Sequence, residues 1–442
     1  MSAPPAASNA GTPTGPSDQL SGASSSPRRR SGTVGVGVAI AIAVILLLVG
    51  IAGGYFIGKG TTSSSSTTIN LTETGSSLLY PLFNDYWFPN YTAPNVVLSA
   101  DSTGSGTGQS SAEQGLVNIG ASDAYLANAS QTNLINFPVA ISAQLIYYNL
   151  PGVNGHINFN GTLLGMIYAG QITTWDNPLI LAAQNTTIAG ELTGLSSQTI
   201  YVVARSDSSG DTYLFTSYCY MSWAGFPYKP ATASMSLSGV PSANVLFGDG
   251  NSGMVTKAQG QPGSIAYIGI SYEASAASAG LQYAAVGDNL TVANGAYAVS
   301  GSDYILPTTA TVSTDANLGL THLDYGTYGL ALTLIMGGVP GTLTPTTAGQ
   351  GGTNPAAAAP ATQPYPIVNL EYALIKTVSG GNVVTSAALA ATVAFMHWAL
   401  SYGNWNAQGS ASNWINAVHF VPLTQEVIGY DMTALASVQS ST

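Results

Sequence analysis

The chain has 442 residues, of which 6% are charged and 45% are hydrophobic. Such a composition excludes a charged disordered protein and a highly basic nucleic-acid-binding protein. All 19 acidic residues except Asp18 follow Lys59, with only four of the eight basic residues, so this part carries a formal charge of −14. It cannot line a DNA or RNA groove. The single cysteine, Cys219, allows no internal disulfide and fits no multi-cysteine zinc spacing.

The first 68 residues predict how the chain is located in the cell. Residues 1–32 are rich in Ser, Pro, Gly and Ala and predict a disordered cytoplasmic tail. Residues 33–58 are uncharged and exceed the ~20 residues that a bilayer requires, so they predict a transmembrane anchor. The arginines at 28–30 place the N-terminus in the cytoplasm. The alternative is a cleaved signal peptide, whose apolar region normally has only ~7–15 residues.

After a Ser/Thr tether at 59–68, the rest of the chain is expected outside the cell, held at the cell membrane by a single pass. Six N-x-S/T sequons follow the anchor and none precedes it: Asn70, Asn90, Asn128, Asn160, Asn185 and Asn289. A chain rich in Asn, Ser and Thr produces some sequons by chance. Together they favour a glycosylated exterior protein, and with an uncleaved anchor they suggest an archaeal cell surface.

Short apolar runs in the outer part alternate with segments typical of helices. The runs at 139–150, 199–204, 264–270 and 365–375 are rich in β-branched and aromatic residues and predict buried strands. Segments 109–117, 161–169, 211–223 and 387–402 predict helices, and the low-complexity stretch 344–363 predicts a loop. This alternation favours an α/β fold with mixed sheets over an all-β sandwich.

Three Gly/Ser segments, at 74–77, 102–108 and 206–210, each precede a predicted helix. Such a segment presents backbone N–H groups, hydroxyl donors and the positive end of a helix dipole at one point, which is how an oxyanion is held with few cations. The alternative interpretation is that these residues are ordinary helix caps and turns.

Two charged residues lie beside these segments. Arg205, the only arginine after Lys59, directly precedes the third segment, and a guanidinium can make a two-pronged contact with a phosphate-like group. Asp123 ends the run Gly-Ala-Ser-Asp at an expected strand-to-turn junction. As alternatives, the arginine is a surface or packing residue and the aspartate caps a helix.

The residues now carry a family resemblance. The segments are TGSSLLYPLF (74–83), GSGTG (104–108), VNIGASDAYL (117–126), INFPVAISAQLIYYNLPGV (135–153), YAGQITTWDNP (168–178), RSDSSGDTYLFTSYC (205–219), GSIAYIG (263–269) and YPIVNLEYALI (365–375). In their order and spacing, along nearly the whole outer part, the chain resembles the phosphate-binding proteins of ATP-driven phosphate importers, which have the type II periplasmic-binding-protein fold.

The resemblance implies two lobes of mixed α/β structure, with crossings near 147–152 and 362–370. Lobe I would comprise 69–148 and 366–442, and lobe II would comprise 149–365. It also implies a monomer that binds inorganic phosphate and the permease subunits of an ABC transporter, without a metal, a cofactor or catalytic residues. Carried over by position, the phosphate contacts would be Ser77, the backbone N–H of Leu78, Ser105, Asp123, Arg205, Ser209, Gly210 and Asp211.

The presence of Asp123 predicts that the site distinguishes between anions. A carboxylate only accepts hydrogen bonds, so its partner must be an oxyanion that carries a proton. Phosphate carries such a proton and sulfate does not, so sulfate, like molybdate and tungstate, is disfavoured.

The sequence departs from the family pattern at Ser77 and Leu78, where Thr and Phe are more common, and at Asp211, where a threonine is usual. Asp211 has two interpretations: a first-turn acid that points away from the ligand, or a second proton acceptor suited to dihydrogen phosphate and an acidic exterior. The sequence pI of about 4.4 motivates the second.

Two other functions compete with phosphate capture. A secreted phosphatase-like enzyme lacks support, because the sequence has no G-x-S-x-G elbow, no phosphate-binding P-loop motif and no two-metal cluster. A surface glycoprotein would fit the anchor and the sequons, but it has no use for an arginine framed by Ser/Gly helix starts.

Overall fold

The computed structural model describes residues 67–229, 232–287, 304–313, 365–380, 383–406 and 413–439. The expected tail, the anchor at 33–58, most of the tether, the sequon at Asn289 and the loop at 344–363 lie outside the described residues. Among the residues described, no helix has the length and hydropathy to span a membrane. The chain divides into two units, Met1–Ser65 and Ser66–Thr442, and every element below belongs to the second.

The first of two large sheets is the centre of lobe I. From its edge inward the strands are β2 (Val96–Ser102), β1 (Ile69–Gly75), β3 (Ile119–Ser122), β12 (Val368–Lys376) and β4 (Leu134–Tyr148). Strand β1 is parallel to β2 and β3, whereas β12 is antiparallel to both β3 and β4. The sheet is therefore mixed, as the alternation of strands and helices predicts.

The second sheet is the centre of lobe II and continues from the end of β4. Its strands are β4, β8 (Ser264–Gly269), β6 (Tyr201–Arg205) and β7 (Val245–Gly248), with β9 (Gln282–Tyr283) beside the end of β4. Strand β8 is antiparallel to β4, and β6 is parallel to β7 and β8. A small third sheet contains β11 (Tyr304–Ile305), β10 (Ala285–Gly287) and β5 (Asn158–Phe159).

Strand β4 belongs to both sheets. It pairs with β12 as far as Ala143 and with β8 from Gln144 onward, so the chain passes between the lobes without leaving the strand. Fourteen of its fifteen residues are buried, and this near-continuous apolar run is typical of a strand that is covered on both faces. The lobe boundaries at 148/149 and 365/366 remain predictions.

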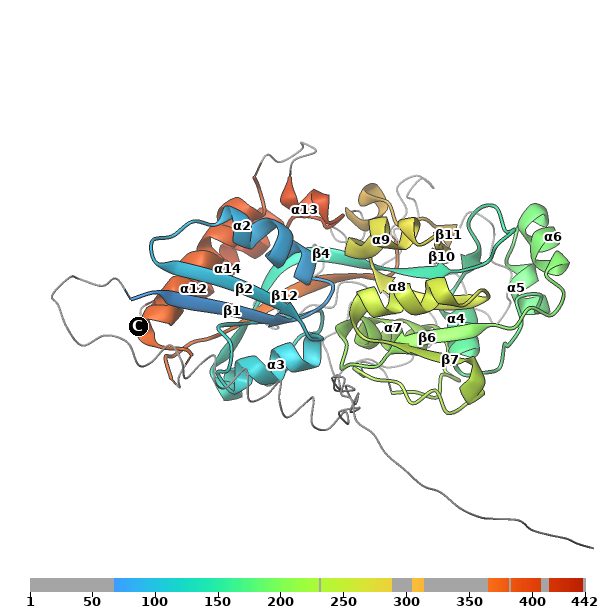
Figure 1. The fold of residues 1–442 in the computed structure, drawn as a ribbon, viewed down its shortest axis with the longest axis horizontal. Helices are drawn as coiled ribbons and strands as arrows, with labels where there is room; N and C mark the ends of the chain where they lie inside the picture. Colours follow the sequence, from blue (N-terminus) through green and yellow to red (C-terminus); the bar gives the residue numbers. More distant parts are fainter. Residues whose placement is uncertain are drawn as a thin grey trace, which may run out of the picture. The chain divides into compact units, whose positions relative to one another are not determined.

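Helices cover both sheets (Figure 1). Lobe I has α2 (Phe88–Asn90), α3 (Ser105–Glu113), α12 (Ser386–Trp398), α13 (Trp414–Ala417) and α14 (Gln425–Gln439), with π-helical turns at Leu82–Trp87 and Ala399–Gly403 and a 3₁₀ turn at Ala129–Thr132. Lobe II has α4 (Gly161–Tyr168), α5 (Pro178–Ala182), α6 (Thr186–Gly194), α7 (Gly210–Ser222), α8 (Gly250–Gly260) and α9 (Glu273–Ser278), with 3₁₀ turns at Ser242–Asn244 and Ile270–Tyr272.

The predicted strands correspond to β4, β6, β8 and β12, and the predicted helices correspond to α3, α4, α7 and α12. The prediction for α3 was wrong at its start, because the helix begins at Ser105 and not at 109. Gly and Ser are weak helix formers, but here packing outweighs propensity. A Cβ on Gly108 would overlap the carbonyl oxygen of Ala121, so glycine lets α3 lie directly against β1 and β3.

Aromatic side chains fill the core of each lobe. In lobe I, Phe395 of α12 packs edge-to-face against Trp87, with ring centroids 6.4 Å apart, and against Phe88 at 5.3 Å. In lobe II, Phe215 of α7 stacks on Tyr267 of β8 at 4.6 Å. The first two contacts join α12 to the helical segment after β1, and the third joins α7 to strand β8.

Buried carboxyl groups are unusually frequent for a chain with few charges. Glu73 on β1 and Asp431 on α14 are 2% and 0% exposed, and neither carboxylate has a hydrogen-bond partner among the described residues. Burial raises the pKa of both groups well above the usual range for carboxyls. A protonated carboxyl needs no cation, which explains how the core tolerates these two groups without an arginine or lysine partner among the described residues.

The buried Asp431 should make the fold more stable in acid than in base. Its folded-state pKa lies above its unfolded value, so its stabilising protonation is complete below about pH 4 and is lost as pH rises through the folded pKa. We expect Asp431→Asn to be more stable than the wild type at pH 8 by about 1–3 kcal/mol, and the difference to shrink at pH 5. Urea unfolding of the full chain measures it.

Glu426→Gln, on an exposed position of the same helix, is the matched control and should leave the pH profile unchanged. Parallel pH profiles for the wild type and Asp431→Asn would contradict the expectation.

Candidate functional site

The candidate site lies where two pairs of parallel strands end, one pair in each lobe. Strands β1 and β3 end at Gly75 and Ser122 in lobe I, and β6 and β7 end at Arg205 and Gly248 in lobe II. Helices α3, α7 and α8 start immediately beyond, so their N-terminal N–H groups and positive dipole ends face one place. In open α/β sheets, ligands bind outside the carboxyl ends of the strands.

On the lobe I side, Asp123 is held by two serines. Ser76 Oγ donates to one carboxylate oxygen of Asp123, and Ser105 Oγ donates to the other at 3.2 Å. Asn369 of β12 donates to the Asp123 backbone carbonyl. Ser76 Oγ also accepts hydrogen bonds from the backbone N–H groups of Leu78 and Leu79, at 3.1 and 3.0 Å. It therefore caps the first helical turn after β1 and orients the carboxylate.

Burial raises the pKa of Asp123, which is 1% exposed. Hydrogen bonds from its neighbours, including Ser76 and Ser105, and the charge of Arg205 oppose this effect. Glu371 of β12, also fully buried, has a pKa that burial and the charge of Asp123 raise well above the usual range. This shift favours the neutral form of Glu371, which reduces the negative charge beside Asp123.

On the lobe II side, Arg205 is buried between two carboxylates. Its Nε and Nη2 donate to the two oxygens of Asp207, with the Nε contact at 2.7 Å, and its Nη1 donates to Asp211 Oδ2 at 2.6 Å. Burial by itself lowers the pKa of Arg205. The hydrogen bond to Asp207 and the negative charges of both aspartates have a larger effect, so the arginine pKa is raised. The guanidinium therefore stays charged while it is 4% exposed.

Asp211 is fully buried in the first turn of α7, and its carboxylate is turned toward Arg205. Oδ2 also accepts from Asn251 Nδ2 at 2.8 Å, and Oδ1 accepts from Gln144 Nε2 at a longer 3.3 Å. Burial and the charge of Asp123 raise the pKa of Asp211 to about 7, while Arg205, Asn251 and Gln144 oppose the shift.

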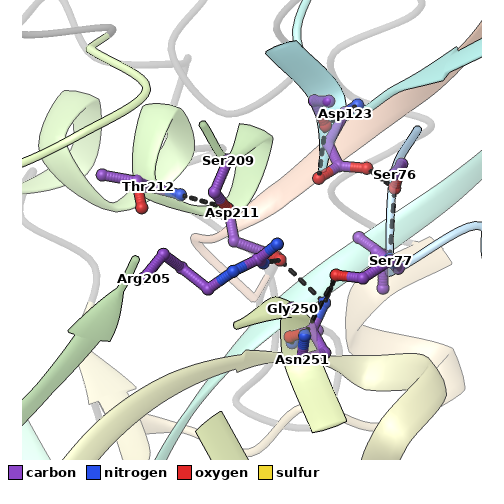
Figure 2. A network of polar contacts seen from close by, with 12 residues as sticks. Ser76, Ser77, Asp123, Arg205, Ser209, Asp211, Thr212, Gly250 and Asn251 are labelled. Carbon is purple, nitrogen blue, oxygen red and sulfur yellow. Dashed lines mark hydrogen bonds and ion pairs between the residues drawn. The ribbon is translucent and has the colours of Figure 1, made fainter. Parts of the chain in front are cut away.

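The lobes contact each other at the site. Figure 2 shows Asn251 of α8 between Asp211 and Ser77, where its backbone N–H and its side-chain amide both donate to Ser77 Oγ at 3.0 Å. Gly106 of α3 donates to the carbonyl of Ser208 at 2.9 Å. The structure therefore has the lobes in contact across the region where a ligand would lie.

All eight residues predicted from the sequence lie at this junction. Ser209 caps α7 by accepting from Thr212 N–H at 3.2 Å, and Gly210 lies against Asp123 and Ser105 of the other lobe. The Leu78 N–H, predicted to contact the ligand, donates here to Ser76. The ligand contacts themselves remain predictions for the whole set: Ser77, Leu78, Ser105, Asp123, Arg205, Ser209, Gly210 and Asp211.

Sequence reasoning missed several residues that complete the site. Asn251 follows Gly-Asp-Gly at the start of α8, the same small-residue signal used for the other helices, so it could have been found. Asp207 lies two residues after Arg205 and could have been proposed as its partner. Gln144 and Glu371 come from the interiors of β4 and β12, and nothing in their local sequence marks them.

Chemically, this arrangement suits the binding of a small oxyanion. It offers helix N-terminal N–H groups, serine hydroxyls and a guanidinium as donors, with carboxylates as acceptors for ligand protons. Within the described ranges, no group of three or more His, Cys, Asp and Glu side chains is placed to hold a metal ion.

Comparison with known proteins gives matches along most of the chain. The family described as "PBP superfamily domain" matches residues 60–402. The phosphate-binding protein PstS of Methanocaldococcus jannaschii is 29% identical over 248 residues, which cover 51% of this chain and 60% of that protein. Phosphate-binding protein PstS3 of Mycobacterium bovis is 34% identical over 183 residues, or 39% of this chain and 46% of that protein. The chain thus spans about half the length of these curated relatives.

Solved structures share the fold. A high-affinity periplasmic phosphate-binding protein, solved with bound phosphate at pH 8.5, superimposes with a TM-score of 0.56 at 18% identity. The match covers 83% of this chain and 93% of that one. At this identity the likeness concerns the two-lobed α/β architecture alone.

Ser76 should be important for both stability and geometry, because one hydroxyl caps a helical turn and orients Asp123. We expect Ser76→Ala to lower the free energy of unfolding by about 1–2 kcal/mol, as lost caps do. It should also raise the pKa of Asp123, which loses a hydrogen bond to its ionised form. Urea denaturation and NMR titration of the carboxyl measure the two effects.

Ser252→Ala, on an exposed position of α8, provides the control and should change neither quantity. A Ser76→Ala variant as stable as this control would rule out the capping role.

Proposed function

The chain belongs to the PBP superfamily, and we propose that it is a substrate-binding protein that captures inorganic phosphate between its lobes for an ABC-type importer. One observation carries this proposal: a buried arginine and a buried aspartate acceptor lie together at a junction of helix N-termini from both lobes. The curated relatives named phosphate-binding proteins support it.

The guanidinium of Arg205 retains donors for a ligand. Of its five N–H groups, three are engaged by Asp207 and Asp211 among the described residues. The other two, one on each terminal nitrogen, are available to an oxyanion. The Asp207 pair fixes the plane of the guanidinium, so little side-chain entropy is lost when the anion binds.

Asp123 supplies the discrimination between anions. It is buried and accepts hydrogen bonds from two serines, so its carboxylate is ready to accept a proton-bearing ligand oxygen as well. A bare sulfate oxygen at the same point would face the carboxylate with no hydrogen between them. Phosphate is therefore favoured over sulfate, molybdate and tungstate.

Capture requires binding and closure, not catalysis. The anion would join the helix N-termini of the two lobes and stabilise the closed form, which the permease subunits in the membrane would recognise. Contacts such as Asn251 to Ser77 and Gly106 to Ser208 support this proposal, because they join the two lobes at the site. The protein would act as a monomer, without a metal or a cofactor.

We further propose that residues 33–58 anchor the protein in an archaeal cell membrane with the binding domain outside the cell. The sequence support is the apolar stretch, the preceding arginines and the sequons that follow. Four sequon asparagines are exposed and suitable as glycan acceptors: Asn70, Asn90, Asn128 and Asn185. Asn160 is buried and caps α4, so it is not an acceptor in the folded protein.

Calorimetry with the full chain tests the ligand. We expect saturable one-to-one binding of phosphate. Sulfate should bind about ten- to a hundredfold more weakly, because it leaves the buried Asp123 carboxylate without a hydrogen-bond donor. Asp123→Asn should reduce the ratio of phosphate affinity to sulfate affinity, because an amide can donate a hydrogen bond to sulfate. Absence of phosphate binding by the wild type would refute the proposed function, and metal-dependent hydrolysis of a phosphate ester would revive the enzyme alternative.

Gly210 should be essential for closure and not for folding. A Cβ at Gly210 would lie 2.5 Å from Asp123 Cβ and 2.7 Å from Ser105 Oγ, both in the opposite lobe. We expect Gly210→Ala to fold but to bind phosphate about ten- to a hundredfold more weakly, the usual cost of overpacking. Calorimetry and thermal unfolding measure the two properties.

Gly190→Ala in α6 is the matched control, since a Cβ there meets nothing within 4 Å. It should retain wild-type affinity and gain up to about 1 kcal/mol of stability. Wild-type affinity in Gly210→Ala would show that the lobes do not close as described here.

A further inference from the structure

The candidate site contains more negative than positive charge even before an anion enters. Arg205 is its only cation among the described residues, and the two-pronged contact with Asp207 already matches that charge. Asp211 adds a second carboxylate to the same guanidinium, and Asp123 lies across the junction. An anion that approaches Arg205 therefore competes with Asp211 for one positive charge.

Asp211 is shielded from solvent, so bulk water does not screen this competition. It is 0% exposed, and the charged and titratable groups that face it come from every element packed around the site. They are Arg205 at the end of β6, Asp207 in the following loop, Asp123 after β3, Glu371 on β12, Tyr267 on β8 and Tyr272 in the turn before α9. Of these, only Arg205 favours the ionised form of Asp211.

We propose that Asp211 makes phosphate capture proton-coupled: as the anion binds to Arg205, the Asp211 carboxylate takes up one proton from solvent. This inference rests on the proposed function and specifies the protonation state in which the site holds its ligand. The step breaks no covalent bond of the protein, and the added proton offsets one unit of the anion's charge in a buried, low-dielectric place.

The geometry indicates which oxygen receives the proton. Oδ2 of Asp211 accepts two short hydrogen bonds, from Arg205 and Asn251, and has no room for a hydrogen of its own. Oδ1 has only the 3.3 Å contact with Gln144. Protonation on Oδ1 leaves the bonds to Arg205 and Asn251 in place, so the guanidinium keeps its orientation when the carboxyl becomes neutral.

The direction of the pH effect follows from linkage. The pKa of Asp211 is about 7 in the ligand-free site, and a neighbouring anion raises it further. Well below pH 7 the group already carries its proton, and binding takes up almost none there. Above pH 7 the free site is ionised, so binding must draw a proton from solvent and affinity falls by up to about tenfold per pH unit. The chain is thus suited to capture phosphate in acid.

The mechanism differs from a direct hydrogen bond between Asp211 and the ligand. Both of its oxygens are directed at protein groups, so Asp211 acts through Arg205 as a positioning and charge-balancing residue. Asp123 remains the residue expected to accept the proton of phosphate. A threonine at 211, the residue usual in the resembling family, would leave Arg205 with Asp207 alone and would require no proton.

Calorimetry in buffers of different ionisation enthalpy tests the proposal, because the slope of the observed heat against that enthalpy counts protons taken up per phosphate. The probe is inorganic phosphate, titrated into the full chain at pH 5 and pH 8. We expect the wild type to take up about one proton more than Asp211→Thr at pH 8, and no more than the variant at pH 5. Ionisation of phosphate itself is common to both proteins and cancels in the difference.

Above pH 7 the phosphate affinity of Asp211→Thr should also decrease less steeply than that of the wild type. Asp211→Asn, which keeps the side-chain shape, provides the same comparison if the threonine variant does not fold. Glu426→Gln removes one negative charge far from the site and should keep the wild-type proton count. Equal proton uptake in the wild type and the Asp211 variants at pH 8 would overturn proton coupling while leaving phosphate capture intact. No phosphate binding by the wild type at pH 5 would instead overturn the function on which it rests.

Discussion

The burial of one guanidinium between carboxylates is the constraint on which the site depends. Arg205 must stay charged without water, so its side chain is fixed by Asp207 and Asp211 at the point where β6 ends. That requirement dictates the polar neighbours: Asn251 and Gln144 take up the remaining acceptor capacity of Asp211. Loss of both carboxylate partners would leave an uncompensated buried charge on Arg205, which costs far more than an exposed ion pair contributes. The surrounding helix N-termini and glycines pack around this buried ion pair.

Much of this arrangement can be predicted from the sequence, because it depends on local sequence patterns. A Ser-Gly pair before a helix predicts the cap at Ser209, and a strand rich in Val and Ile predicts β6, which ends at Arg205. Partners that are far apart in the sequence cannot be predicted in this way. Gln144 and Asp211 are 67 residues apart, and Asn251 and Ser77 are 174 apart, so only the folded chain reveals that they meet. The orientation of Asp211 is of this second kind: two interpretations were open until its partners were known. The anchor and the tail remain predictions from composition.

Several buried carboxyl groups among the described residues have a raised pKa. Glu73, Asp123, Asp211, Glu371 and Asp431 are all buried, and the pKa of each is raised, by burial in the first place. Because the chain has a net charge of −11, its own electrostatic field repels anions at neutral pH. Each proton that these groups retain reduces that field. The same carboxyls that favour folding in acid therefore also reduce the repulsion that an approaching anion experiences.

Strand β4 gives the two lobes a common mechanical element. Gln144 is the residue at which this strand exchanges one sheet for the other, and its backbone N–H and carbonyl are bonded to Ile367 and Tyr365, on the second chain segment between the lobes. Its side chain donates to the backbone carbonyl of Asp211 at 2.7 Å. A rotation of one lobe relative to the other must therefore twist the residue that touches the charge-balancing aspartate. One amide side chain therefore joins the strand shared by the two sheets to the buried ion pair of Arg205 and Asp211.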